Sequence, residues 1–432
     1  MSSTPARRHH SGKQRAFLIF NITLAALTIL AGSGLVYANW KLGNRKVVSI
    51  DPVANGDGNL DLPEGDRTAK NFLITGSDNN ACISKDSPFY GGFSNRVGYG
   101  ERSDSLMVVR VNPIDNQAAI LSFPRDMWVK QAGSNRSNRI NANFEKKNPN
   151  RLIRNIKENF DINIDHYINI DFCAFAAIVD AVGGVRVPFT YKAQDKMTGF
   201  KVLRARVCYT FQGDHALAYM RSRHYKWFNP KTMKWTSDGT SDWGRISRQQ
   251  DFMKRVIRKS LEKAKTNPRV ASGILNAALK NIITDDKLTP LTVLQLGQAM
   301  KNFNTETMGS YTMPGNGQII DDMSVIVPDL ESATSKKILS VFQGKSSLKT
   351  TIVGATPAAN AMVTTTVAIL ATATTAPKTT TTTPIQSTTT VPQSSKTTVK
   401  VSPTTTTTTV PKVAIEQNTR GVVPPNDANC QF

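Results

Sequence analysis

The chain has 432 residues and a formal net charge of +22, with 54 lysine and arginine residues against 32 aspartate and glutamate residues. This excess of positive charge favours a polyanionic partner or an anionic membrane surface. An apolar N-terminal run and a threonine-rich C-terminal segment leave roughly 300 residues of globular composition, which suffice for the core of one domain and argue against two.

The N-terminal part predicts a membrane anchor. Residues 16–38 contain no charged residue, and their length matches the ~20 residues that cross a bilayer. A cleaved signal peptide is the alternative, but its apolar region is typically only ~7–15 residues long. Because residues 1–15 form a basic tail, we expect the N-terminus in the cytoplasm and the body of this single-pass protein outside the cell. This location argues against nucleic acid as the partner.

Turn-forming, strand-like and helical segments then follow one another. Residues 39–69 are rich in glycine, aspartate and proline and suit a stalk, and residues 79–101 predict a long glycine-rich loop. Apolar runs predict strands at residues 71–76, 105–111, 118–123, 166–170 and 185–187. Helical periodicity predicts helices at residues 152–160, 172–182, 246–265, 269–279 and 290–301. Strands that alternate with helices indicate an α/β layered domain, which we place at residues 70–345.

The C-terminal part predicts an extended segment. Residues 355–432 consist largely of threonine, proline, serine, alanine and lysine. Such a composition does not bury a core, so we expect a disordered spacer.

The chain contains four cysteines, at positions 82, 173, 208 and 430. Outside the cell they can form disulfides, with three possible connectivities between which the sequence does not choose. The absence of CxxC or Cys/His ligand spacing in the sequence argues against a zinc site.

Residues 213–250 hold the densest set of candidate binding residues. They comprise four arginines and a glutamine in an apolar setting: Arg221, Arg223, Arg245, Arg248 and Gln249. Arg245 and Gln249 are four residues apart at the start of a predicted helix, so they share one face. Arginine suits phosphate because its planar fork forms paired hydrogen bonds at fixed charge. The sequence therefore predicts an anion site here, with a solvated basic face as the alternative.

Two carboxylates stand at the ends of predicted strands. Asp78 follows the strand at residues 71–76, and Asp104 precedes the strand at residues 105–111. If these strands are neighbours, the pair could bind a hard divalent cation such as magnesium. The alternative is that each aspartate is only a turn residue. Arg125, just after the third strand, offers another arginine at the same edge, or else a salt-bridged turn.

Together these residues form a pattern that resembles the LytR-CpsA-Psr family of cell-wall glycopolymer ligases. Seven blocks occur in the family's order within about residues 70–265: NFLITGSD (71–78), RSDS (102–105), SFPRD (122–126), RINA (139–142), VDAVGG (179–184), ALAYMRSR (216–223) and GRISRQQ (244–250).

The resemblance implies a three-layer α/β/α sandwich with a central mixed sheet and a long apolar pocket for a polyprenyl chain. It implies a transfer of a glycan from a polyprenyl diphosphate carrier to a peptidoglycan hydroxyl, leaving polyprenyl phosphate. By matching positions it assigns the metal, Mg²⁺ or Mn²⁺, to Asp78 and Asp104. Catalytic roles fall to Asp104 and to the residues that would bind the diphosphate: Arg102, Arg125, Arg221, Arg223, Arg245 and Gln249.

Alternatives of other kinds stay open at this point. The same residues could serve a polyprenyl diphosphate phosphatase with water as acceptor, or the basic body could make a non-catalytic wall-binding scaffold. Transcription regulation is opposed by the predicted topology. Residues 224–243 carry Tyr225, Trp227, Phe228 and Trp235, which could form a lid, a saccharide platform or an ordinary packed loop.

Overall fold

The computed structural model describes residues 46–50, 69–77, 82–90, 103–266, 282–348, 418–425 and 430. The predicted anchor at residues 16–38, the predicted helix at residues 269–279 and most of the predicted spacer lie outside the described residues. Among the described residues, no helix combines the length and the apolar character that crossing a bilayer requires. The chain divides into a unit of Met1–Gly354 with Val410–Phe432 and a second unit, Ala355–Thr409, which lies wholly outside the described residues.

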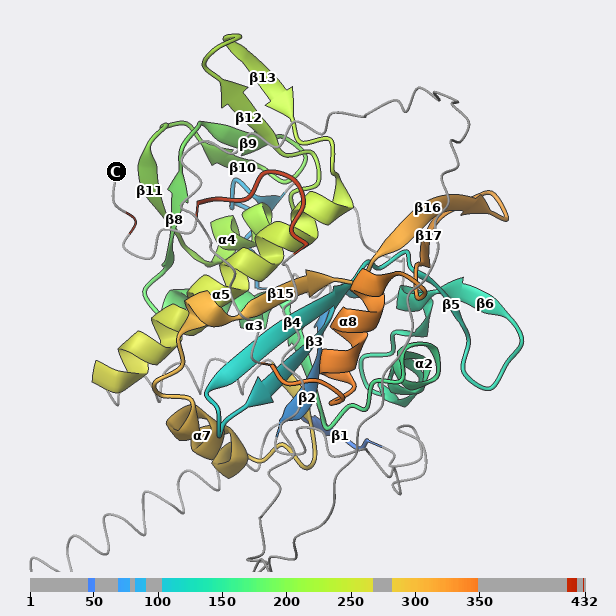
Figure 1. The fold of residues 1–432 in the computed structure, drawn as a ribbon. Coiled ribbons are helices and arrows are strands. Elements are labelled where there is room, and N and C mark those ends of the chain that lie inside the picture. The colour runs from blue at the N-terminus through green and yellow to red at the C-terminus, as the bar shows by residue number, and fades with distance from the viewer. Residues whose placement is uncertain are drawn as a thin grey trace, which may run out of the picture. The chain divides into compact units, whose positions relative to one another are not determined.

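A seven-stranded mixed sheet forms the centre of the first unit (Figure 1). Its strands, in spatial order, are β1 (Lys46–Val48), β14 (Ile282–Asp285), β7 (His166–Asp171), β2 (Lys70–Ser77), β3 (Ser103–Asn112), β4 (Gln117–Phe123) and β15 (Gly309–Thr312). β2 pairs parallel with β7 and antiparallel with β3, and β15 pairs parallel with β4. The predicted α/β fold with a central mixed sheet is therefore confirmed.

Helices pack on both faces of this sheet (Figure 1). On one face Leu73, Val108 and Leu121 lie in a core with α2 (Asn150–Phe160) and α8 (Ala333–Phe342). On the other face alternate strand residues such as Met107 and Ile120 pack against α5 (Asp242–Thr266) and α7 (Pro290–Ala299). Because successive strand residues point to opposite faces, the near-continuous apolar runs of β3 and β4 supply both cores.

A second group of elements packs around α5 and forms its own aromatic core. It comprises α3 (Phe172–Ala181), β8 (Val185–Phe189), β9 (Ala193–Asp195), β10 (Phe200–Val202), β11 (Val207–Phe211), α4 (Gly213–Met220), β12 (Lys226–Asn229) and β13 (Lys234–Ser237). β9, β10, β12 and β13 form a four-stranded sheet in the order β10-β9-β12-β13. The remaining short elements are β5 (Trp128–Lys130), β6 (Ser137–Arg139), η4 (Ile140–Asn143), η5 (Thr305–Thr307), β16 (Gly315–Ile320) and β17 (Met323–Pro328).

Two segments differ from the sequence-based expectation. β1 lies inside the predicted stalk and adds a parallel edge strand beside β14. β12 and β13 form a hairpin inside the segment that the sequence suggested as a loop. These three strands are only three or four residues long, which is too short for apolar periodicity to show in the sequence. β1 is defined by its pairing with the distant strand β14, and β12 and β13 are defined by their pairing across a turn.

The last described residues also differ from the predicted disordered spacer. Residues 418–425 lie against the first unit, and Cys430 forms a disulfide with Cys208. The other disulfide joins Cys82 to Cys173. The structure thus selects one of the three connectivities, and it returns the chain to the domain beyond the threonine-rich segment.

Candidate active site

Four strand ends meet at one edge of the central sheet. β2 and β7 run parallel and end together, because Ser77 pairs with Asp171. β3 begins and β4 ends at the same edge, where Leu106 pairs with Phe123. The motifs that follow or precede these strands in the sequence are therefore brought to one place by the sheet topology.

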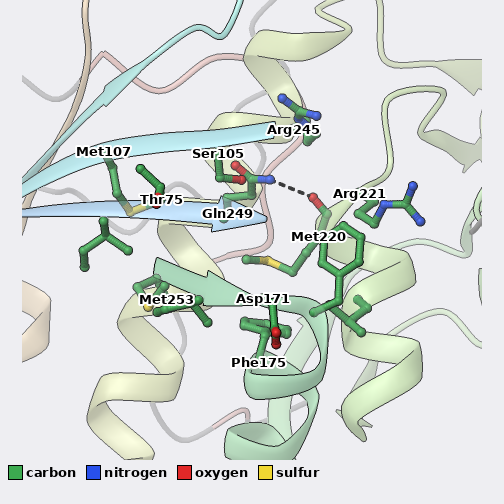
Figure 2. Close-up of a pocket in the computed structure, with 15 residues that line it drawn as sticks. Thr75, Ser105, Met107, Asp171, Phe175, Met220, Arg221, Arg245, Gln249 and Met253 are labelled. Atoms are coloured by element: carbon green, nitrogen blue, oxygen red, sulfur yellow. Dashed lines mark hydrogen bonds between the residues drawn. The ribbon is translucent and has the colours of Figure 1, made fainter. Parts of the chain in front are cut away.

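A pocket opens beside this edge, between β2, β3 and β7 of the sheet and helices α3, α4 and α5. It contains about 640 Å³ of space, part of it open to solvent. Most of its lining is apolar: Ile74, Met107, Ile170, Phe172, Phe175, Leu217, Met220 and Met253. Figure 2 shows Met107 and Met253 at one end of the labelled set and the guanidinium groups of Arg221 and Arg245 at the other. The pocket is thus an apolar cavity with a cationic mouth.

Helix α5 and the end of α4 deliver the polar groups of the mouth. Arg245 and Gln249 lie one turn apart near the start of α5, and both line the pocket as their spacing predicted. Gln249 donates from Nε2 to the carbonyl oxygen of Met220 at 3.1 Å, which ties α5 to the last residue of α4. Arg221 follows α4 directly, and its guanidinium carbon lies 5.0 Å from the ring centre of Phe172.

Asp242 links two of the predicted phosphate-binding arginines. Its Oδ1 lies 2.8 Å from Nη2 of Arg245 and 3.0 Å from Nε of Arg223. Arg245 is almost fully buried, whereas the side chain of Arg223 is one quarter exposed. The carboxylate orients both guanidinium groups at the mouth, so Arg223 joins the site through Asp242 and is not part of the pocket lining.

Arg248, the fourth arginine of this stretch, belongs to the protein interior. It is fully buried, and its Nη1 lies 2.6 Å from Oδ2 of Asp238. Its Nη2 donates to the carbonyl oxygen of Ser222 at 2.9 Å, and its guanidinium carbon lies 4.4 Å from the ring centre of Tyr225. Sequence alone grouped Arg248 with the anion-binding arginines, and the structure corrects that assignment.

The buried carboxyl of Asp238 stays ionised because neighbouring groups donate hydrogen bonds to it and Arg248 supplies a positive charge. Burial by itself would raise its pKa, but a hydrogen bond from Thr240 and the nearby charge of Arg248 outweigh burial and lower the pKa below its usual range. The Arg248–Asp238 pair therefore holds the loop before α5 against the helix at neutral pH.

Further contacts fix the start of α5 on the sheet and under the C-terminal segment, residues 418–425. Gln250 donates to Oγ of Ser122 at 2.8 Å and to the carbonyl oxygen of Tyr311 at 2.7 Å. On the C-terminal segment, the backbone nitrogen of Arg420 donates to Oγ of Ser247 at 2.9 Å, and its guanidinium carbon lies 4.3 Å from the ring centre of Trp243. These contacts surround the turn that carries Arg245 and leave the pocket-facing side of the helix open.

Asn418 attaches the C-terminal segment to the edge of the central sheet. Its Oδ1 accepts from the backbone nitrogen of Thr312 at 2.8 Å, and its Nδ2 donates to the carbonyl oxygen of Thr312 at 2.6 Å. Thr312 is the last residue of the edge strand β15. Farther along, Nη2 of Arg255 donates to the carbonyl oxygen of Pro425 at 2.8 Å. The segment therefore lies along α5 from its first turn to its fourth.

The other predicted site residues fall into two groups. Arg125 lies just beyond β4 at the site edge of the sheet, and its Nε is 3.3 Å from Oδ2 of Asp126, as in the predicted salt-bridged turn. It is not among the residues that line the pocket. Asp78 and Arg102 lie outside the described residues, and of Asp104 only the backbone is described. The assignments to these three residues stay predictions.

The backbone around Asp104 has a feature that the sequence did not reveal. Gly76 pairs with Ser105 and Ser77 pairs with Ser103, so Asp104 is the extra residue of a β-bulge in β3. Bulges commonly redirect a side chain beside an active site. The condition stated for the carboxylate pair, that the two strands are neighbours, is met. Within the described ranges, no cluster of three or more His, Cys, Asp or Glu side chains is placed to bind a metal.

Sequence reasoning missed Asp171 and Ser105, two polar residues of the pocket. Asp171 ends β7 as Asp78 follows β2, so the same signal, an aspartate after an apolar strand, could have found it. Its Oδ1 accepts from the backbone nitrogen of Ala174 at 2.8 Å and caps α3. Ser105 belongs to the RSDS block (102–105), and its place in that block was its only signal.

The chain is similar in sequence to proteins that are already known. The LytR_cpsA_psr family model matches residues 41–340 of the chain. The polyisoprenyl-teichoic acid–peptidoglycan teichoic acid transferase TagU of Halalkalibacterium halodurans is 26% identical over 322 residues, which are 74% of this chain and 95% of that protein. Biofilm regulatory protein A of Streptococcus mutans is 27% identical over 314 residues, which are 68% of this chain and 71% of that protein.

A solved structure also matches the chain. The LytR-Csp2A-Psr enzyme from Actinomyces oris is 20% identical and aligns with a TM-score of 0.49, covering 69% of this chain and 96% of that one.

Proposed function

The chain belongs to the LytR-CpsA-Psr family, and from this membership and the pocket we propose that it transfers a glycopolymer from a polyprenyl diphosphate carrier to a hydroxyl group of peptidoglycan. The observation that carries the proposal is the combination of an apolar cavity with Arg221, Arg245 and Gln249 at its mouth. Such a cavity suits an amphiphile with a long hydrocarbon part and an anionic head.

The two ends of the pocket match the two parts of the proposed donor. The apolar residues contributed by β2, β3, α3, α4 and α5 would bury prenyl units, each buried CH₂ group contributing about 0.8 kcal/mol. The arginines would bind the diphosphate oxygens through paired hydrogen bonds. TagU of Halalkalibacterium halodurans carries polyisoprenyl-linked teichoic acid in its name, which supports a donor of this class.

In the proposed reaction the acceptor hydroxyl oxygen attacks the phosphorus that carries the glycan. A new phosphate ester bond forms, and the bond from that phosphorus to the bridging oxygen of the diphosphate breaks. The bridging oxygen leaves on polyprenyl phosphate, and the hydroxyl proton passes to a base. Such transfers depend mainly on positioning and on stabilising the charge that develops on oxygen. Arg221 and Arg245, held in place by Phe172 and Asp242, would supply this stabilisation.

A divalent cation, Mg²⁺ or Mn²⁺, fits the chemistry of the residues at this edge. Asp104 occupies a β-bulge beside Ser77, the residue that precedes Asp78, and carboxylate oxygens are ligands that hard cations prefer. Asp78 and Asp104 would hold the ion, and when bound it would neutralise negative charge on the diphosphate. In this proposal the arginines bind and orient the donor whether or not the ion is present.

We also propose that residues 16–38 anchor the protein in the cell membrane, with the catalytic domain outside the cell. The support is the uncharged apolar run behind a basic tail. In that location the pocket would be within reach of both a membrane lipid and the wall.

The decisive experiment supplies the full-length protein with a polyprenyl-diphosphate-linked glycan and purified peptidoglycan. The proposal expects glycan joined to peptidoglycan through a phosphodiester, with equimolar polyprenyl phosphate, both measured by mass spectrometry. Release of glycan phosphate without attachment would instead establish a phosphatase. Full transfer by Arg221→Ala would refute the role given to that guanidinium. Binding of the unaltered protein to peptidoglycan with neither transfer nor release would favour a non-catalytic scaffold.

A further inference from the structure

The four-stranded sheet of β9, β10, β12 and β13 has one face turned to the protein core. Asp195, Phe200 and Val202 are almost fully buried, and they alternate with residues that are not. Trp227 pairs with Ala193 on the same inward face and packs against the aromatic core. Of the four aromatic residues that could bind saccharide, Tyr225 is therefore a core residue and Trp227 is partly buried against the core.

The register of the strands defines what lies on the opposite face. Lys201 pairs with Gln194, Gln194 pairs with Lys226, and Phe228 pairs with Trp235. Directly opposed residues share a face, and so do residues two apart in one strand. The outward surface, called here the hairpin face, is thus formed by Lys192, Gln194, Lys201, Lys226, Phe228 and Trp235.

The hairpin face combines aromatic rings with exposed positive charge. Phe228 and Trp235 form an edge-to-face pair with ring centres 5.7 Å apart, and Nζ of Lys192 lies 5.6 Å from the Phe228 ring centre. Three lysines are exposed on this face. Among the described strands of this sheet, the acidic residue Asp195 points inward and accepts hydrogen bonds from Ser222 and His224.

The hairpin is next to residues of the pocket mouth in the sequence, and it lies far from β1 in the fold. The hairpin is inserted between Arg223 and Asp242, which are themselves 3.0 Å apart through their ion pair. Figure 1 shows β12 and β13 at the top and β1 at the bottom of the unit. Only residues 39–45 separate the predicted span from β1, and seven residues reach at most about 25 Å. If residues 16–38 are the anchor, β1 lies within about 25 Å of the membrane, and the hairpin lies at the opposite end of the unit from β1.

We propose that the hairpin face binds the peptidoglycan acceptor, a sugar polymer whose peptide branches carry carboxylates. The rings of Phe228 and Trp235 would contact the apolar faces of sugar rings, and Lys192, Lys201 and Lys226 would attract the carboxylates. This inference rests on the proposed transferase function, and it assigns the acceptor to a surface separate from the lipid pocket. An acceptor bound there would enter the mouth from the side opposite the membrane.

Co-sedimentation of the full-length protein with purified insoluble peptidoglycan tests the proposal directly. The double variant Lys226→Gln/Trp235→Ala should bind about tenfold more weakly, since it loses one charge and one stacking ring. Amidation of the peptidoglycan carboxylates should weaken binding of the unaltered protein as well. Lys234→Gln is the matched control, because Lys234 pairs with Asn229 and points to the opposite side of the same hairpin. Equal losses in Lys234→Gln would show mere non-specific attraction and overturn the proposal.

A kinetic arm separates this proposal from the proposed function itself. In the transfer assay the double variant should raise KM for peptidoglycan about tenfold at unchanged kcat, while KM for the polyprenyl-diphosphate-linked donor stays the same. If the unaltered protein transfers nothing, the transferase function fails, but the sedimentation result still decides whether the hairpin face binds peptidoglycan. Unchanged sedimentation of the double variant, or a loss confined to vesicles of anionic phospholipid, would refute the proposal.

Discussion

Replacing Arg245 by lysine should abolish most transfer activity and cost little stability. Arg245 is 2% exposed and lies at the pocket mouth with Nη2 2.8 Å from Asp242. Lysine keeps the charge but loses the planar fork, so one charge-assisted hydrogen bond to the diphosphate is lost, about 2–3 kcal/mol. We therefore expect kcat/KM to fall roughly 30- to 150-fold. Asp242 keeps Arg223 as its partner, so the free energy of unfolding should fall by only about 1 kcal/mol.

Arg248, one turn farther along α5, provides the contrasting case. Arg248→Met leaves Asp238, whose side chain is 3% exposed, without the guanidinium that lies 2.6 Å away. Removing one partner of a buried ion pair costs about 3–5 kcal/mol. This variant should unfold at clearly lower temperature or denaturant concentration, whereas the fraction that stays folded should retain its specific activity.

The two variants are measured side by side by transfer kinetics and by denaturant unfolding. Lys259→Gln, a partly exposed lysine on the same helix, serves as the control for a simple loss of charge on α5. A kcat/KM of Arg245→Lys within threefold of the unaltered protein would refute the role given to its guanidinium. Equal destabilisation by Arg245→Lys and Arg248→Met would refute the distinction between a pocket arginine and a core arginine.

Other predictions concern the cavity, the C-terminal segment and pH. Met253→Trp should fill the apolar end of the pocket and reduce the polyprenyl lipid that co-purifies with the protein, measured by mass spectrometry; undiminished lipid would place the chain elsewhere. Asn418→Ala removes both hydrogen bonds to the backbone of Thr312 and should lower the free energy of unfolding by about 1–3 kcal/mol. Burial lowers the pKa of His215 to about 4 from 6.5. As pH falls, the histidine is therefore protonated in the unfolded chain before it is protonated in the folded protein. The free energy of unfolding should decline between pH 6.5 and 4 by at most about 3 kcal/mol. His215→Phe should flatten that decline, and an unchanged pH profile in this variant would assign the decline to other groups.

Much of the fold was predictable from local sequence. The apolar runs that became β2, β3, β4 and β7 and the periodic segments that became α2, α3 and α7 lie within a few residues of their expected bounds. These elements bury enough apolar surface that their period of two or of about 3.6 residues shows directly in the sequence. The short strands β1, β9 and β10 have no such signal, because their partners in the sheets define them.

The candidate site was partly predictable for the same reason. The spacing of Arg245 and Gln249 places them on one face of a helix whatever that helix packs against. The spacing did not show that Arg248, three residues after Arg245, points instead toward Asp238 in the interior. That distinction depends on which side of α5 faces the pocket, and only the packing of α5 against the sheet sets it.

The sequence by itself determined the family pattern, the cationic stretch and the strands whose ends carry Asp78, Asp104 and Arg125. Only the tertiary structure decided that β2, β3 and β7 lie side by side, which brings an apolar cavity beneath Arg221 and Arg245. It also decided that residues 418–425, which follow the threonine-rich segment in the sequence, pack against α5. The physical reason is that pairing across long chain separations depends on complementary surfaces, whereas local composition records only the conformation of each segment.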